Sequence, residues 1–142
     1  MLKFNKVCLC LFFAAGLQAA TALAERSVSP QGASVYIISP LNGETVSSPF
    51  KVVFGLSGMG VAPAGTQIVD TGHHHLLIDV SLPDLNAPIP AGDNHRHFGK
   101  GQTETELELS SGSHTLQLLL ADGLHVPHQA PVFSELITIT VP

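Results

Sequence analysis

The sequence predicts an all-β protein, a single immunoglobulin-like β-sandwich of six to eight short antiparallel strands. Two observations support this prediction. Short apolar or alternating runs recur after residue 25, and none of them has the 3.6-residue periodicity of an amphipathic helix. Clusters of Gly, Pro, Ser and Asn separate these runs, as turns separate the strands of a sandwich. The chain has no Trp and no cysteine pair after residue 24, so the prediction concerns the architecture only.

The first 24 residues have the features of a secretory signal peptide. Two lysines precede a short apolar run, and the segment ends in Ala-Leu-Ala, the small-residue pattern of a cleavage site. We therefore predict cleavage after Ala24 and export to the periplasm, with a flexible leader over residues 25–33 and the β-sandwich over residues 34–142. No later apolar run approaches the roughly 20 residues of a membrane helix, so the mature chain is expected to have no membrane span.

Removal of the signal peptide changes the cysteine count and the charge. Cys8 and Cys10 both leave, so the mature chain has no thiol and no disulfide. It keeps four basic residues against eleven acidic ones, a formal charge of −7. Such a chain repels phosphates, and we do not expect it to bind nucleic acid. The same charge attracts cations in general.

Six strands are expected, over residues 34–39, 50–56, 74–82, 103–109, 113–121 and 133–141. The last range shows the alternation best, because apolar residues there are interleaved with Thr138 and Thr140. In the fourth range Glu104, Glu106 and Glu108 alternate with other residues, which indicates a solvated face of a half-buried sheet.

Eight histidines, against four Lys and Arg in the mature chain, are the compositional anomaly. They fall into four places: His73 to His75, His95 with His97, His114 alone, and His125 with His128. Residues two apart in an extended chain share a face. Two pairs, His73 with His75 and His95 with His97, are therefore each expected to point two imidazoles in one direction, with His74 pointing the other way.

The expected topology brings most of these groups together. If the six strands follow the order A, B, C, E, F and G of a sandwich, one end holds the start of the third strand, the segment before the fourth and the connection after residue 121. Every histidine except His114 lies in one of those places, and Met59 lies in the glycine-rich loop at the same end. We expect His114 to be structural and to bond a turn carbonyl. For each of the other groups there is a simpler alternative, in which the histidines are solvated loop residues that bind no metal.

Clustered imidazoles without thiolates favour copper, zinc or nickel. A methionine sulfur favours copper, which is our first choice, with zinc second. The core candidate ligands are His73, His75, His125 and His128, and the further candidates are His95, His97 and Met59. Asp70, Asp93 and Asp122 are the nearest carboxylates in sequence, as ligands or as acceptors for the outer ring N–H. Because ligating imidazoles must be deprotonated, affinity is expected to fall as pH drops through about 6.5.

Three functions compete. The first is a periplasmic copper chaperone, buffer or resistance factor. The second is a β-sandwich module that holds an envelope protein or peptide at its loop end or edge strand, without a metal. The third is a metalloenzyme, which ranks lowest because no obvious proton-transfer pair is present and a saturated histidine site leaves no open position for substrate.

Three long motifs resemble a family of small exported bacterial proteins described as a domain of unknown function. They are GHHHLLID at residues 72–79, HFGKGQTE at residues 97–104 and HTLQLLLADGLHVPH at residues 114–128. The resemblance extends over about residues 39–141. It implies export and a single β domain, and it implies no activity and no catalytic residue.

Overall fold

The structure, a computed structural model, describes residues 26–142, so the predicted signal peptide and its cleavage site lie outside the described residues. Eight strands make up this part: β1 (Ser34–Ser39), β2 (Phe50–Ser57), β3 (Gly60–Val61), β4 (Thr71–Ile78), β5 (His95–His97), β6 (Glu104–Leu107), β7 (Gly112–Ala121) and β8 (Ile137–Val141). Within residues 26–142 there is no helix long and apolar enough to cross a membrane.

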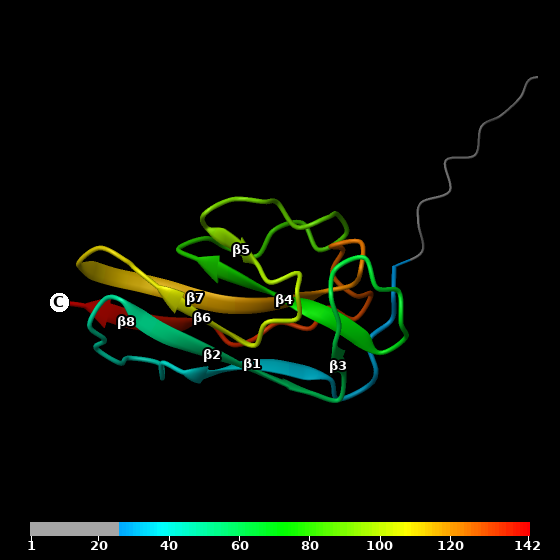
Figure 1. The fold of residues 1–142 in the computed structure, drawn as a ribbon, viewed down its shortest axis with the longest axis horizontal. Helices are drawn as coiled ribbons and strands as arrows, with labels where there is room; N and C mark the ends of the chain where they lie inside the picture. Colours follow the sequence, from blue (N-terminus) through cyan, green and yellow to red (C-terminus); the bar gives the residue numbers. More distant parts are fainter. Residues whose placement is uncertain (1–25) are drawn as a thin grey trace, which may run out of the picture.

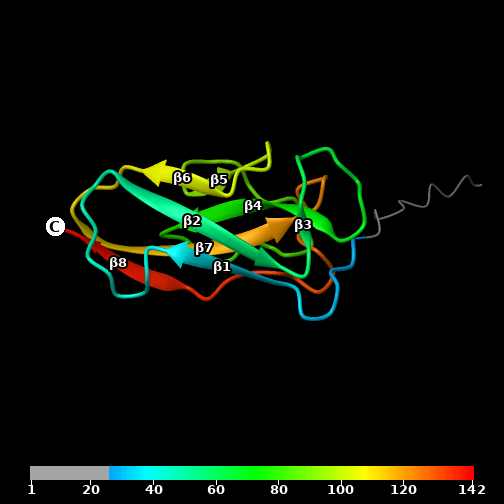
Figure 2. The same ribbon diagram turned by 60° about the horizontal axis from the view of Figure 1, so that its bottom comes forward.

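The strands form two sheets, which confirms the predicted all-β sandwich. The smaller sheet has the order β1-β2-β6, and Figure 2 turns it toward the reader. The larger sheet has the order β3-β4-β7-β8, with β5 also paired to β4. In Figure 1, β1 and β2 run below β4 and β7, and β5 lies on the other side of β4.

The main core lies between the two sheets. Val52 and Phe54 of β2 meet Leu76 of β4 and Leu118 of β7, all of them buried. Period-2 alternation explains this set, because every second residue of each strand points inward. Each buried side chain of this size stabilises the fold by about 2 kcal/mol.

A second, smaller core covers the outer face of the larger sheet. Leu77 of β4 and Leu119 of β7 pack there against Ile89 from the long connection between β4 and β5. As a result, β4 is buried on both faces from Gly72 to Ile78. Both faces of its histidine run are therefore withdrawn from water.

The largest differences from the predicted strand boundaries are at β4 and at the last strand, β8. β4 begins at Thr71 instead of residue 74, and it ends at Ile78 instead of residue 82 because Asp79 takes a left-handed conformation, φ 56°. The last strand begins at Ile137 instead of residue 133. The reason is Ser134, whose hydroxyl accepts the Leu118 amide in place of a backbone carbonyl.

Two short strands were not predicted. β5 pairs antiparallel with β4, and β3 pairs parallel with the first residues of β4, so the sandwich is not wholly antiparallel. Two and three residues are too short for a pattern of alternation. Only their pairing with β4 makes these segments strands.

The segment expected to be a flexible leader makes specific contacts from Arg26 onward. It lies along residues 127–130, where the Arg26 side chain donates to the Pro127 carbonyl at 2.9 Å and the Gln129 amide donates to the Ser27 carbonyl at 2.8 Å. The Ser29 hydroxyl donates to the Ala130 carbonyl at 2.5 Å. These contacts attach the segment to the connection that follows β7.

Candidate metal centre

The start of β4 sends its three consecutive histidines to opposite faces of the sheet. The rings of His73 and His75 lie on the outer face with their centroids 4.8 Å apart. His74 points into the main core, where its ring lies 5.2 Å from Phe54. All three side chains are buried. The alternation that the sequence predicted for this run is therefore present.

β5 places a third imidazole beside this pair. His97 is paired with His75 across the two strands, and its ring lies 5.0 Å from the rings of both His73 and His75. Side chains that face each other across an antiparallel pair are close by construction. His97 is exposed, so the outer edge of the group is open to solvent.

A tight turn after β7 brings the fourth imidazole. His125 has φ 67°, a left-handed conformation that is unfavourable for a residue with a side chain. Asp122 stabilises the turn around it, because its Oδ1 accepts the amides of Leu124 and Val126 at 2.9 and 3.1 Å. The His125 amide also donates to the Asp122 carbonyl at 3.0 Å.

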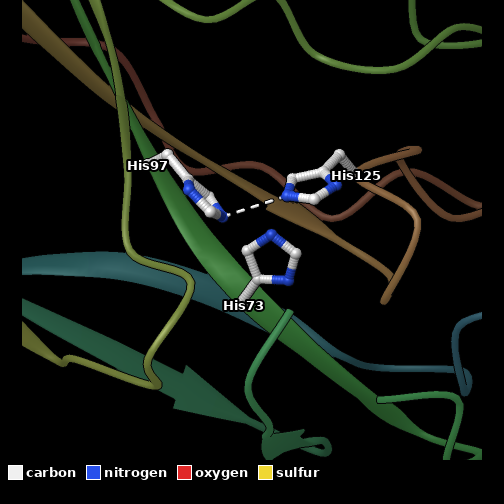
Figure 3. Close-up of side chains that lie close together, drawn as sticks. All are labelled: His73, His97 and His125. Atoms are coloured by element: carbon white, nitrogen blue, oxygen red, sulfur yellow. Dashed lines mark hydrogen bonds between the residues drawn. The ribbon is translucent and has the colours of Figure 1, made fainter. Parts of the chain in front are cut away.

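Three of these imidazoles have the geometry of a metal site (Figure 3). One nitrogen from each of His73, His97 and His125 lies within 4.8 Å of the others. The Nε2 atoms of His97 and His125 are 3.2 Å apart. Two imidazole nitrogens bound to one tetrahedral ion, each at about 2.0–2.1 Å from it, have a similar separation of about 3.4 Å. Small side-chain rotations would therefore bring all three onto one ion.

Burial disfavours the charged form of three imidazoles at this site, those of His73, His75 and His97. Burial lowers the pKa of His73 to about 4 and the pKa of His75 to about 3, and the neighbouring imidazoles add to both shifts. Partial burial of the His97 ring, together with His125, also lowers the pKa of His97. A neutral imidazole offers a lone pair, which is the form that binds metals. Protons therefore compete at a more acidic pH than the value of about 6.5 expected from the sequence.

Unpaired nitrogens show that the group fits a cation. Both ring nitrogens of His73 and Nδ1 of His75 are buried and have no hydrogen-bond partner among residues 26–142. An unpaired buried polar group costs about 1–3 kcal/mol. A metal ion would use one such nitrogen of His73, and His75 offers another beside it.

The other candidate ligands lie outside this group of three. His75 is the nearest, with its ring 6.0 Å from that of His125. His95, two residues before His97 in β5, pairs with Leu77, and Met59 packs against the main core. His128 is buried elsewhere, with Nε2 3.2 Å from the Thr71 carbonyl oxygen.

The carboxylates do not act as the sequence suggested, and one small residue has a part that the sequence did not reveal. Asp122 builds the turn, and within residues 26–142 no carboxylate hydrogen-bonds to His73, His97 or His125. Gly99 lies against the ring of His97, where a Cβ atom would overlap that ring. The Asp-Gly pair at residues 122–123 is a turn signal that could have located the turn.

His114 confirms its predicted structural role at the far end of β7. Its Nε2 lies 2.9 Å from the Ser110 carbonyl oxygen, a turn carbonyl, and its Nδ1 lies 2.7 Å from Oδ2 of Asp79. Both ring nitrogens therefore face oxygen acceptors. Such a ring has no lone pair free for a metal.

A family model described as "Domain of unknown function (DUF4399)" matches residues 52–142. This range contains strands β3 to β8 and the three histidines of the group. No curated protein matches the chain, and no solved structure matches it.

Proposed function

Because the chain belongs to the DUF4399 family, whose description names no activity, we propose its function from the site itself: a periplasmic copper-binding protein that acts as a chaperone, buffer or resistance factor. The observation that supports this proposal is the group of His73, His97 and His125, with their nitrogens within 4.8 Å. Of the other histidines, His75 lies nearest to this group, and it would complete the ligand set as the fourth imidazole.

The ligand chemistry supports copper before zinc. The group offers neutral imidazoles and no thiolate, which suits both ions, and the usual affinity order of divalent ions places copper above zinc. Met59 adds nothing to this preference, because its side chain packs against the main core. The signal peptide predicted from the sequence supports the periplasmic location, where such a protein would take up or release the ion.

The exposure of the ligands supports reversible binding. His73 and His75 are buried, His125 is half-buried and His97 is exposed. A ligand-exchange reaction can therefore begin at His97, while the two buried histidines retain the ion. A partner that accepts the ion would approach from this edge.

Calorimetric titration of the untagged mature chain, residues 25–142, tests the proposal. Copper(II), copper(I) under anaerobic conditions and zinc are titrated separately, and we expect submicromolar binding of one copper ion. The double variant His97→Ala, His125→Ala should lose this binding and keep its fold, because neither side chain is fully buried.

The matched control is His95→Ala, which removes a histidine from the same strand but outside the group. It should bind copper as the unmodified chain does. Binding only at millimolar copper, or equal losses in the control and the double variant, would overturn the proposal. The second hypothesis, a non-metal module for an envelope protein or peptide, would then take its place.

A further inference from the structure

A cavity of about 380 Å³ lies beside the turn that carries His125. Its walls come from residues 27–30, from the connection at residues 66–71, from the turn at residues 122–124 and from His128. None of the three grouped histidines is among the described residues that line it. Cavities of about 300–1,000 Å³ are the usual size of small-molecule sites.

The outer walls of this cavity are apolar and exposed. Val28, Ile68, Val69 and Leu124 all line it, and between 51% and 84% of each residue is accessible to solvent. Ten large apolar residues are exposed in residues 26–142, and these are four of them. Exposed apolar side chains that gather in one place indicate a binding site, whereas scattered ones do not.

The inner wall is acidic. Asp122 is 7% exposed, and its carboxylate accepts three hydrogen bonds: from the Ser27 hydroxyl at 2.8 Å and from the amides of Leu124 and Val126. An ionised carboxylate has about four acceptor positions, so one stays free for a ligand. All three partners are donors, and donors of this kind hydrogen-bond to the ionised form of a carboxylate.

No positive side chain balances this carboxylate inside the cavity. Among the described lining residues there is no Lys or Arg, and Asp70 adds a second acid. The guanidinium of the nearby Arg26 is directed to the carbonyls of Pro127 and His128 and to Asn86. The charge of the cavity therefore favours a cationic head group.

We propose that this cavity binds a small cationic amphiphile, with a protonated amine at Asp122 and a short alkyl chain against Val28, Ile68 and Leu124. The amine donates to the free acceptor position of the carboxylate. The alkyl chain covers apolar side chains that otherwise face water. None of the three grouped histidines lines this cavity, so binding here is measured on the metal-free chain, separately from the metal titration.

An NMR titration of the ¹⁵N-labelled mature chain compares three probes with the same alkyl chain: hexylammonium, 1-hexanol and hexanoate. Hexylammonium should bind with a Kd about tenfold lower than hexanol, the effect of one charge-assisted hydrogen bond. Hexanoate should bind most weakly of the three. The amide shifts should centre on residues 27–30, 66–71 and 122–124.

Two variants separate the head group from the chain. Asp122→Asn should remove the preference for hexylammonium over hexanol. Ile68→Ser should weaken the binding of hexylammonium and of hexanol by the same factor. Ile38 is an exposed isoleucine on β1 outside the cavity, and Ile38→Ser should change neither affinity.

Three results would overturn the proposal. Equal Kd values for all three probes would show that Asp122 does not select the charge of the head group. Shifts spread over exposed apolar residues such as Ile38 would show unspecific adsorption. If hexanoate bound most tightly, the cavity would have to be positively charged, which contradicts its acidic lining.

Discussion

The histidines at the two ends of the larger sheet have opposite surroundings. At the start of β4, His73 lies among other imidazoles, with no carboxylate bonded to it among the described residues, and its pKa is lowered. At the start of β7, His114 lies between Asp79 and the Ser110 carbonyl, and its pKa is raised, first by the hydrogen bond to Asp79. The surroundings of His73 favour the neutral ring, whereas those of His114 favour the protonated ring.

This difference separates a ligand from a structural residue. A neutral imidazole keeps a lone pair for a metal, whereas an imidazolium between two oxygen acceptors has none. The same residue type thus serves either purpose, and its hydrogen-bond partners decide which. A count of histidines in a sequence cannot make that distinction.

The largest expected effect is on copper affinity. His73→Asn should lower it by at least about 100-fold, because removal of a ligand exceeds the 10–100-fold loss typical of residues that support ligands. Competition titration with a chelator measures the change. His114→Asn is the comparison, and an equal loss in that variant would contradict the distinction between the two ends.

The second effect is on the stability of the metal-free chain in acid. His73 and His75 have lowered pKa values in the folded state, so the unfolded chain binds more protons below about pH 6.5. The free energy of unfolding should therefore fall as pH drops from 6.5 toward 4, by about 2 kcal/mol for each of the two histidines between pH 7 and pH 5. Urea unfolding at several pH values measures it.

The control for this second effect is the His73→Asn chain, in which one neutral buried imidazole is absent. Its free energy of unfolding should fall less between the same two pH values. If both chains lose the same free energy, burial of His73 does not cause the acid sensitivity.

A third effect concerns the position of a ligand. Gly99→Ala would place a Cβ atom against the His97 ring and displace it, so copper affinity should fall by about tenfold with every histidine still present. Gly92→Ala provides the matched control, because a Cβ atom there meets nothing within 4 Å. Calorimetric titration of both variants would show whether close packing under His97 matters.

The smallest effect belongs to the other end of the sheet. The folded-state pKa of His114 is raised, so its stabilising contribution is complete below about pH 6.5 and is lost as pH rises through the folded value. His114→Asn should destabilise the fold by about 1 kcal/mol at pH 5.5, and by less at pH 8.5. A larger loss at pH 8.5 would show that the ring acts through packing instead.

The sequence predicted the local relations of the site. Period-2 alternation placed His73 and His75 on one face and His74 on the other, because backbone geometry alone determines which side chains share a face. The isolated position of His114 at the start of a strand also predicted its structural role.

The same reasoning named His128 as a core ligand and His97 only as a further candidate, whereas the group of three contains His97 and not His128. His97 reaches the group because the three residues of β5 pair with β4, and His128 is buried elsewhere, beside Thr71, because the chain turns at Asp122. Both outcomes depend on contacts between segments distant in sequence, which no local pattern records.

By itself, then, the sequence determined the fold class, the faces of β4 and the supply of imidazoles. The tertiary structure decided which three imidazoles meet, that burial lowers the pKa of His73, and that an acidic cavity lies beside the turn after β7. The physical reason is the distance along the chain over which each effect is determined. Alternation follows from the backbone geometry of neighbouring residues, whereas the burial and charge of each ring depend on the segments that the fold packs around it.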